Sequence, residues 1–114
     1  MEFVIRSGRC DCLAHPFVDR FARKYYDGDL NGVANLLTAA WSDNELGEII
    51  ELAKQYEVAF ELNPSTILGD PIFSKRLWNF GKEIGAQFNM GTDAHNIAGI
   101  DTWKLLDNYK QILY

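Results

Sequence analysis

The sequence is short of several features that mark specialised classes of protein, and each shortage excludes something. No apolar run in the 114 residues approaches the roughly 20 residues that a membrane-spanning helix needs. No apolar segment follows the first six residues, which argues against a secretory signal peptide. With 11 basic residues against 16 acidic ones, the chain also lacks the basic surface of a nucleic-acid binder. We therefore expect a cytoplasmic protein without a membrane or nucleic-acid partner.

Cysteine and histidine are scarce as well. The two cysteines, Cys10 and Cys12, stand two apart in a segment with strand character, too close together for a mutual disulfide. We interpret them as small buried apolar residues, with metal binding as the less favoured alternative. The two histidines of the sequence are His15 and His95. A site that needs several imidazoles therefore cannot be completed by these 114 residues.

The sequence does contain an alternation of strand and helix patterns, within a single domain that we assign to residues 1–114. Hydrophobic residues make up 47% of the chain, which is enough for one core. Three short apolar segments are typical of strands, and helical patterns follow each of them. The three segments are residues 10–14, 58–62 and 86–90. This alternation predicts a parallel sheet with right-handed crossovers.

Helix signals lie between these strands. Ser42 followed by Glu45 has the spacing of a capping box, which predicts that a helix begins there and runs to about residue 56. Pro71 in a first turn and Gly85 as a terminating glycine enclose another helix. The remaining expectations are strand character in residues 1–6, a short helix over 18–26, a turn at 27–29, partial helix in 30–41, loop in 65–70, and a last helix over about 101–113.

The most informative stretch is residues 89–95, NMGTDAH, at the end of the third predicted strand. Asp93 and His95 stand two apart, so in an extended segment both side chains point to the same side. Gly91 allows the backbone to turn sharply just before them. A carboxylate and an imidazole together suit a divalent zinc, manganese or iron ion. The Asp-x-His pattern alone is a weak signal.

Polar residues also follow the first two strands. His15 ends the first strand, and the proline after it favours an extended conformation; a capping or surface histidine is the alternative. Glu61 interrupts the apolar second strand, and Asn63 follows it. Glu61 could orient a ligand histidine together with Asn63; the alternative is a salt-bridged residue or a residue of an edge strand. Since parallel sheets place their chemistry at the carboxyl ends of the strands, the three clusters together predict a metal site.

The order of these motifs resembles the later motifs of the PHP (polymerase and histidinol phosphatase) superfamily. Its members are metal-dependent phosphoesterases built on a distorted (β/α)7 barrel. The resemblance rests on residues 14–16 (AHP), 60–63 (FELN) and 91–95 (GTDAH), so it extends over most of the chain.

That resemblance implies a role for each polar cluster. His15, Asp93 and His95 would be direct ligands in a cluster of two or three metal ions, and Glu61 and Asn63 would support the site from nearby. The activity implied is hydrolysis of phosphate esters by a metal-activated water. The implied substrate is a phosphorylated small molecule.

The sequence also departs from the family. PHP domains begin with a His-x-His pair and add a bridging glutamate and further histidines, which two histidines cannot supply. The chain therefore looks like the carboxyl-terminal half of the barrel, an α/β fold of about three parallel strands. The long segment between His15 and Glu61 suggests an extra helix. We expect weak or absent activity without the missing motifs, and bound zinc, manganese or iron at reduced stoichiometry.

A half barrel predicts association. It would leave sheet edges open and an inner face uncovered, formed by Phe60, Leu62, Phe88 and Met90 or their neighbours. The partner would be a second copy of the chain or a complementary N-terminal half. Two alternatives remain, a non-catalytic α/β interaction module that retains the motif residues and one segment of a longer protein.

Overall fold

A computed structural model describes residues 1–18 and 36–114 of the chain. In order, its elements are α1 (Glu2–Arg6), β1 (Cys12–Leu13), α3 (Leu36–Ala40), α4 (Asp43–Gln55), β2 (Ala59–Leu62), α5 (Pro64–Gly69), α6 (Pro71–Ile84), β3 (Phe88–Met90), the 3-10 helix η1 (Ile97–Gly99) and α7 (Trp103–Leu113). The helix expected over 18–26, the turn at 27–29 and the first part of the helix expected over 30–41 lie largely outside the described residues. None of the helices described here has the length and apolar character to span a membrane.

The three strands form one parallel sheet in the order β1-β2-β3, as the alternation predicted. Phe60 of β2 pairs with Leu13 on one side and with Phe88 on the other. Within the described residues the sheet is open, and the expected partial barrel is not confirmed. Closing a sheet into a barrel takes about eight strands with consistent tilt and stagger, and the described strands are only two to four residues long.

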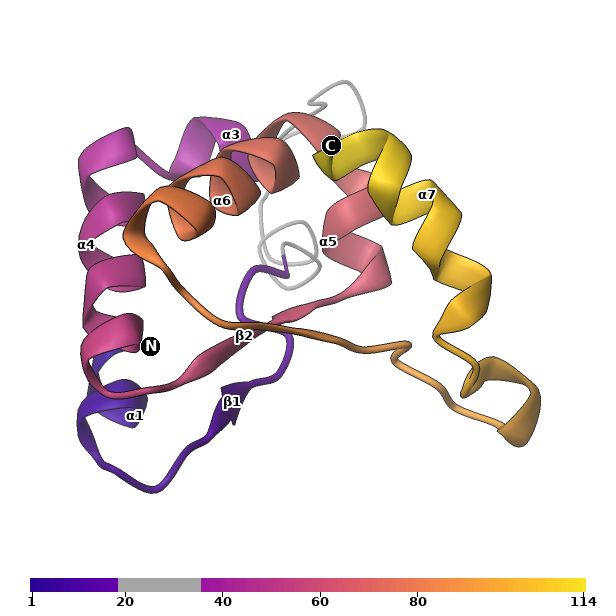
Figure 1. The fold of residues 1–114 in the computed structure, drawn as a ribbon, viewed down its shortest axis with the longest axis horizontal. Helices are drawn as coiled ribbons and strands as arrows, with labels where there is room; N and C mark the ends of the chain where they lie inside the picture. Colours follow the sequence, from indigo (N-terminus) through magenta and orange to yellow (C-terminus); the bar gives the residue numbers. More distant parts are fainter. Residues whose placement is uncertain (19–35) are drawn as a thin grey trace, which may run out of the picture.

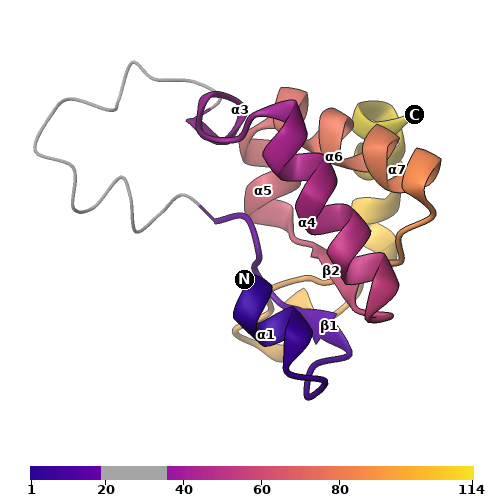
Figure 2. The ribbon, with the colours of Figure 1, turned by 90° about the vertical axis from the view of Figure 1, so that its left-hand side faces the viewer.

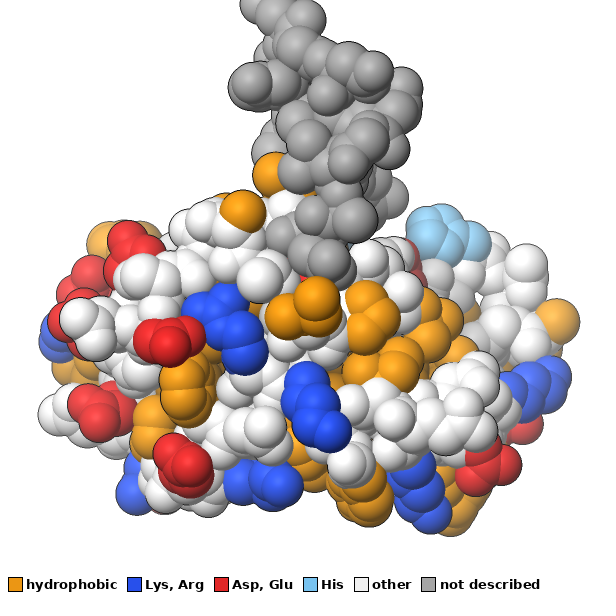
Figure 3. Space-filling view, turned by 90° about the horizontal axis from the view of Figure 1, so that it is seen from above, with side chains coloured by type: hydrophobic (Ala, Val, Ile, Leu, Met, Phe, Trp, Pro, Cys, Tyr) orange, Lys and Arg blue, Asp and Glu red, His pale blue; other side chains and the backbone are white. Residues whose placement is uncertain are grey.

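The helices α3 to α7 lie on one side of the sheet, and α1 lies near β1 (Figures 1 and 2). Helix α4 begins where the capping box predicted, because the Ser42 hydroxyl accepts from the Glu45 amide and the Glu45 carboxylate accepts from the Ser42 amide. Helix α6 has Pro71 in its first turn and ends at Gly85 with φ at 87°, so its predicted limits are also confirmed. On the face seen from above in Figure 3, basic, acidic and hydrophobic side chains are interspersed.

Two predictions of local structure are wrong. Residues 1–6 contain helix α1 in place of strand, with Ile5 fully buried and Glu2 paired to Arg6 one turn later at 2.8 Å. Residues 65–70 contain most of helix α5 in place of loop. The side chain of Asn63 accepts from the amide of the second residue of α5 at 2.9 Å, and proline occupies the first position. An Asn-Pro pair that ends a strand therefore also begins a helix.

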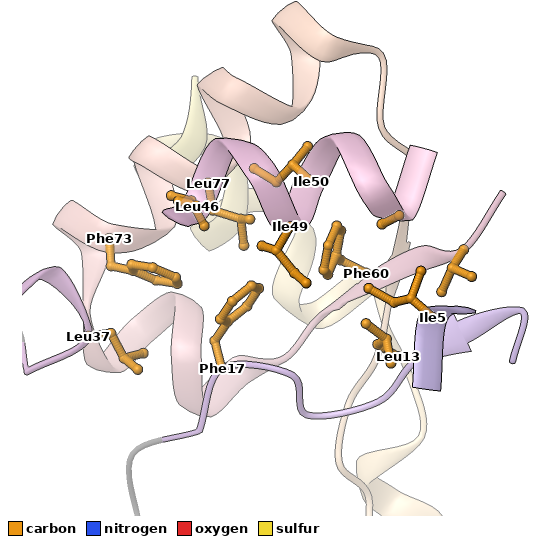
Figure 4. Packing of buried hydrophobic residues seen from close by; sticks show 12 residues of the cluster. Ile5, Leu13, Phe17, Leu37, Leu46, Ile49, Ile50, Phe60, Phe73 and Leu77 are labelled. Atoms are coloured by element: carbon orange, nitrogen blue, oxygen red, sulfur yellow. The ribbon is translucent and has the colours of Figure 1, made fainter. Parts of the chain in front are cut away.

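The main core lies between the sheet and helices α4 and α6 (Figure 4). Phe60 of β2 and Phe73 of α6 are fully buried in it, and Phe17 packs against both rings. A second cluster joins Leu62 of β2 to α5 and α7. The expectation that Phe60 and Leu62 lie on an uncovered face is wrong, because helices cover them. Since side chains alternate along a strand, Glu61 lies on the opposite face of the sheet.

Candidate functional site

The carboxyl ends of β1 and β3 bring His15 and Asp93 together across β2. The His15 Nε2 atom lies 3.4 Å from Asp93 Oδ1. Both residues have left-handed backbones, with φ at 51° and 52°. Such a conformation costs a residue with a side chain of the order of 1–3 kcal/mol and persists only where surrounding contacts impose it. Strain on both members of one pair is typical of a functional site.

This geometry corrects two expectations about the backbone. His15 is not extended before its proline, and Asp93 is not extended either. Because Asp93 is left-handed, the side-chain alternation of an extended strand does not apply between Asp93 and His95. The His95 Nδ1 atom instead lies 2.7 Å from the main-chain carbonyl oxygen of Asp93.

Glu61 and Asn63 hold His15 from β2 and the loop that follows it. The His15 amide donates to Glu61 Oε2 at 2.7 Å, and the His15 Nδ1 atom lies 3.0 Å from the same oxygen. The Asn63 Nδ2 atom is 2.8 Å from that Nδ1. Asn63 is 1% exposed and the Glu61 side chain 13% exposed, while 41% of the His15 side chain is open to solvent. The predicted supporting residues therefore do contact His15.

The contacts of His15 Nδ1 allow two proton arrangements. Asn63 Oδ1 accepts from the Ser65 amide, so its Nδ2 faces His15 and can only donate. In one arrangement Nδ1 accepts from Asn63, and Nε2 carries a proton towards Asp93. In the other, Nδ1 donates to Glu61 and the Nε2 lone pair faces Asp93; the Asn63 Nδ2 must then turn away from Nδ1, because two donors cannot face each other at 2.8 Å. The second arrangement is the state that a metal-binding histidine needs.

The spacing of the two facing donor atoms fits a shared cation. Two ligands at 2.0–2.1 Å from a tetrahedral ion lie about 3.3–3.4 Å apart, and His15 Nε2 and Asp93 Oδ1 are separated by 3.4 Å. His95 has a suitable tautomer as well. A carbonyl oxygen can only accept, so the His95 Nδ1 carries a proton, and in the neutral ring Nε2 then carries the lone pair.

The predicted site residues are not all in contact through their side chains. The His15 ring contacts the side chains of Glu61, Asn63 and Asp93. The His95 ring instead contacts the main-chain carbonyl oxygen of Asp93. Among residues 1–18 and 36–114, no group of three His, Cys, Asp or Glu side chains is placed to hold a metal ion. The described geometry thus offers a pair of donors, His15 and Asp93, with the second histidine, His95, nearby in sequence.

Tyr109 of α7 is a neighbour of the site that the sequence did not predict. Its hydroxyl donates to the carbonyl of Leu62, the last residue of β2, at 3.1 Å. Burial, and to a lesser degree the negative charge of Glu61, raise the pKa of Tyr109 from 10 to about 12. The apolar pattern of α7 predicts that this tyrosine faces the core, but not which carbonyl its hydroxyl reaches.

No protein-family model matches the chain, and no solved structure matches it. A protein of Aliivibrio fischeri (strain MJ11) named as a probable phosphatase is 29% identical to the chain over 116 residues. The match extends over 94% of this chain and 38% of that protein, so the chain spans well under half of its relative's length.

Proposed function

We propose that the chain is part of a metal-dependent phosphatase of the PHP type, in which His15 and Asp93 bind one divalent cation together and His95 adds a further ligand. The observation that carries the proposal is the 3.4 Å approach of His15 Nε2 to Asp93 Oδ1, from the ends of two strands on either side of β2. The phosphatase part of the proposal is supported by the name of the Aliivibrio fischeri relative.

The donor set suits this chemistry. Imidazole nitrogen and carboxylate oxygen are ligands of zinc, manganese and iron, and a third ligand supplied by His95 would still leave a coordination position open. A cation held there would activate a water molecule and neutralise the oxygens of a phosphate ester. The partial exposure of His15 leaves the position accessible to a phosphorylated small molecule.

The residues around His15 have positioning roles in this proposal. Glu61 fixes the main chain of His15 and accepts from Nδ1 when the Nε2 lone pair is needed for a cation. Asn63 places its amide beside the ring because its own oxygen caps α5. Ligands for a larger metal cluster would come from a complementary segment or from a second copy of the chain.

The test is titration of the purified chain with zinc and with manganese by calorimetry. We expect about one ion per chain, and His15→Ala or Asp93→Asn should weaken binding by at least about tenfold. Asp107→Asn, an exposed carboxylate of α7, is the matched control and should bind as the parent does. Unchanged binding in both site variants would rule out the shared cation. Hydrolysis of p-nitrophenyl phosphate should be weak and should require the metal.

A non-catalytic interaction module is the second candidate. It is favoured by exposed apolar side chains after β3, since Ile97 is 86%, Ile100 63% and Trp103 76% exposed. Trp103 also lines a hollow of about 170 Å³ with Met90, Thr102 and Leu106. A chain of this kind would bind neither metal stoichiometrically in the same titration.

A further inference from the structure

Gly91 lies directly after β3 and against β2. Its amide donates to the Leu62 carbonyl at 3.3 Å, and it follows Asn89, the residue paired with Glu61, by two positions on the strand. Residues in this diagonal relation lie on the same face of a sheet within reach of each other. The φ angle of Gly91 is outside the left-handed region, so backbone conformation does not demand a glycine here.

The space beside Gly91 is filled by Glu61. A Cβ added at Gly91 would lie 2.6 Å from Cδ and 2.7 Å from Cγ of Glu61, and it would overlap Oε1. Carbon atoms in van der Waals contact lie about 3.5–4.0 Å apart. An alanine at this position would therefore displace the Glu61 carboxylate, which is the mobile partner of the two.

The position of that carboxylate matters because it holds His15. Its Oε2 atom accepts the His15 amide at 2.7 Å and lies 3.0 Å from His15 Nδ1. A hydrogen bond to a carboxylate is among the stronger ones, and this one stabilises the strained backbone of His15, with φ at 51°.

We propose that Gly91 is a positioning residue, whose missing side chain makes the room in which Glu61 holds His15. The claim that this arrangement positions His15 as a metal ligand rests on the proposed function. The steric relation between Gly91, Glu61 and His15 does not. It is open to measurement on the metal-free chain.

The experiment is amide hydrogen exchange by NMR on the Gly91→Ala variant without metal. The amide of His15 should exchange roughly tenfold faster than in the parent, as expected when a hydrogen bond to a charged group is lost. Exchange within α4 should be unchanged, which separates a local effect from general destabilisation. Gly47→Ala is the matched control, because nothing lies within 4 Å of an added Cβ there.

A coupled variant identifies the cause. In the Glu61→Ala background the space is empty, so adding Gly91→Ala should change His15 exchange no further. Should Gly91→Ala alone fail to fold, the double variant should fold again. The proposal is overturned if Gly91→Ala leaves His15 exchange as it was, if the two effects add, or if the double variant also fails to fold. Zinc titration tests the proposed function separately, and a negative titration leaves these results standing.

Discussion

Replacing Asp70 by alanine should cost a large part of the stability of the chain. Asp70 is a carboxylate at the junction of α5 and α6 and is 4% exposed. It accepts from the Phe73 amide at 3.0 Å, which caps α6. It also accepts from the amide and the hydroxyl of Thr38 in α3, at 3.0 and 2.9 Å. One side chain thus joins α6 to a helix 32 residues earlier.

The magnitude follows from these three contacts. Loss of an N-cap costs about 1 kcal/mol. Each hydrogen bond lost at Thr38 costs about 1 kcal/mol, the value for an ordinary intramolecular hydrogen bond, because Thr38 is only partly buried and water can replace the acceptor. The free energy of unfolding should therefore fall by about 3 kcal/mol in Asp70→Ala.

The assay is urea unfolding followed by circular dichroism at neutral pH. Thr38→Val, which removes one of the three contacts, should cost about 1 kcal/mol, and Asp70→Asn should fall between the two variants because it still has an oxygen to cap α6. A loss below about 1 kcal/mol in Asp70→Ala, the worth of the cap alone, would refute the reasoning that this carboxylate holds α3.

Two further predictions concern packing and pH. The Phe88 ring lies where a Cβ of Gly81 would be, so Gly81→Ala should lower the free energy of unfolding in urea by about 1–3 kcal/mol. Gly47→Ala is the control and should be neutral or stabilising. Equal effects of the two substitutions would contradict this packing of Phe88 against Gly81. The pKa of Tyr109 is raised from 10 to about 12 by burial and by Glu61, so between these values the folded chain binds more protons than the unfolded one and stability falls as the pH rises. Tyr109→Phe should show a smaller alkaline loss of stability, measured as urea midpoints on both sides of pH 10, and an unchanged loss would show that Tyr109 is not its source.

The sequence predicted those parts of the fold that depend on local signals. The capping box at Ser42 and the proline and glycine around α6 act within a few residues, so their helices were found. Helix α1 was missed because five residues are too few to show a period, and burial of Ile5 against the core decides its conformation. Helix α5 was missed because an Asn-Pro pair after an apolar strand indicates the end of that strand, and the same pair also begins a helix here.

The sequence predicted that the site residues lie at the carboxyl ends of the strands. Parallel strands place their carboxyl ends at one edge, which is why His15, Glu61 and Asp93 were expected together. The left-handed backbones at His15 and Asp93, and the room that Gly91 leaves for Glu61, were not predictable. They depend on the register between strands and on side-chain contacts across tens of residues, which no local pattern encodes.

The most direct test of a cation shared by His15 and Asp93 is anomalous diffraction at the zinc absorption edge from crystals grown with zinc. We predict a peak about 2.0–2.2 Å from both His15 Nε2 and an Asp93 carboxylate oxygen. Zinc bound only elsewhere, for example at Cys10 and Cys12, with no peak between His15 and Asp93, would contradict it.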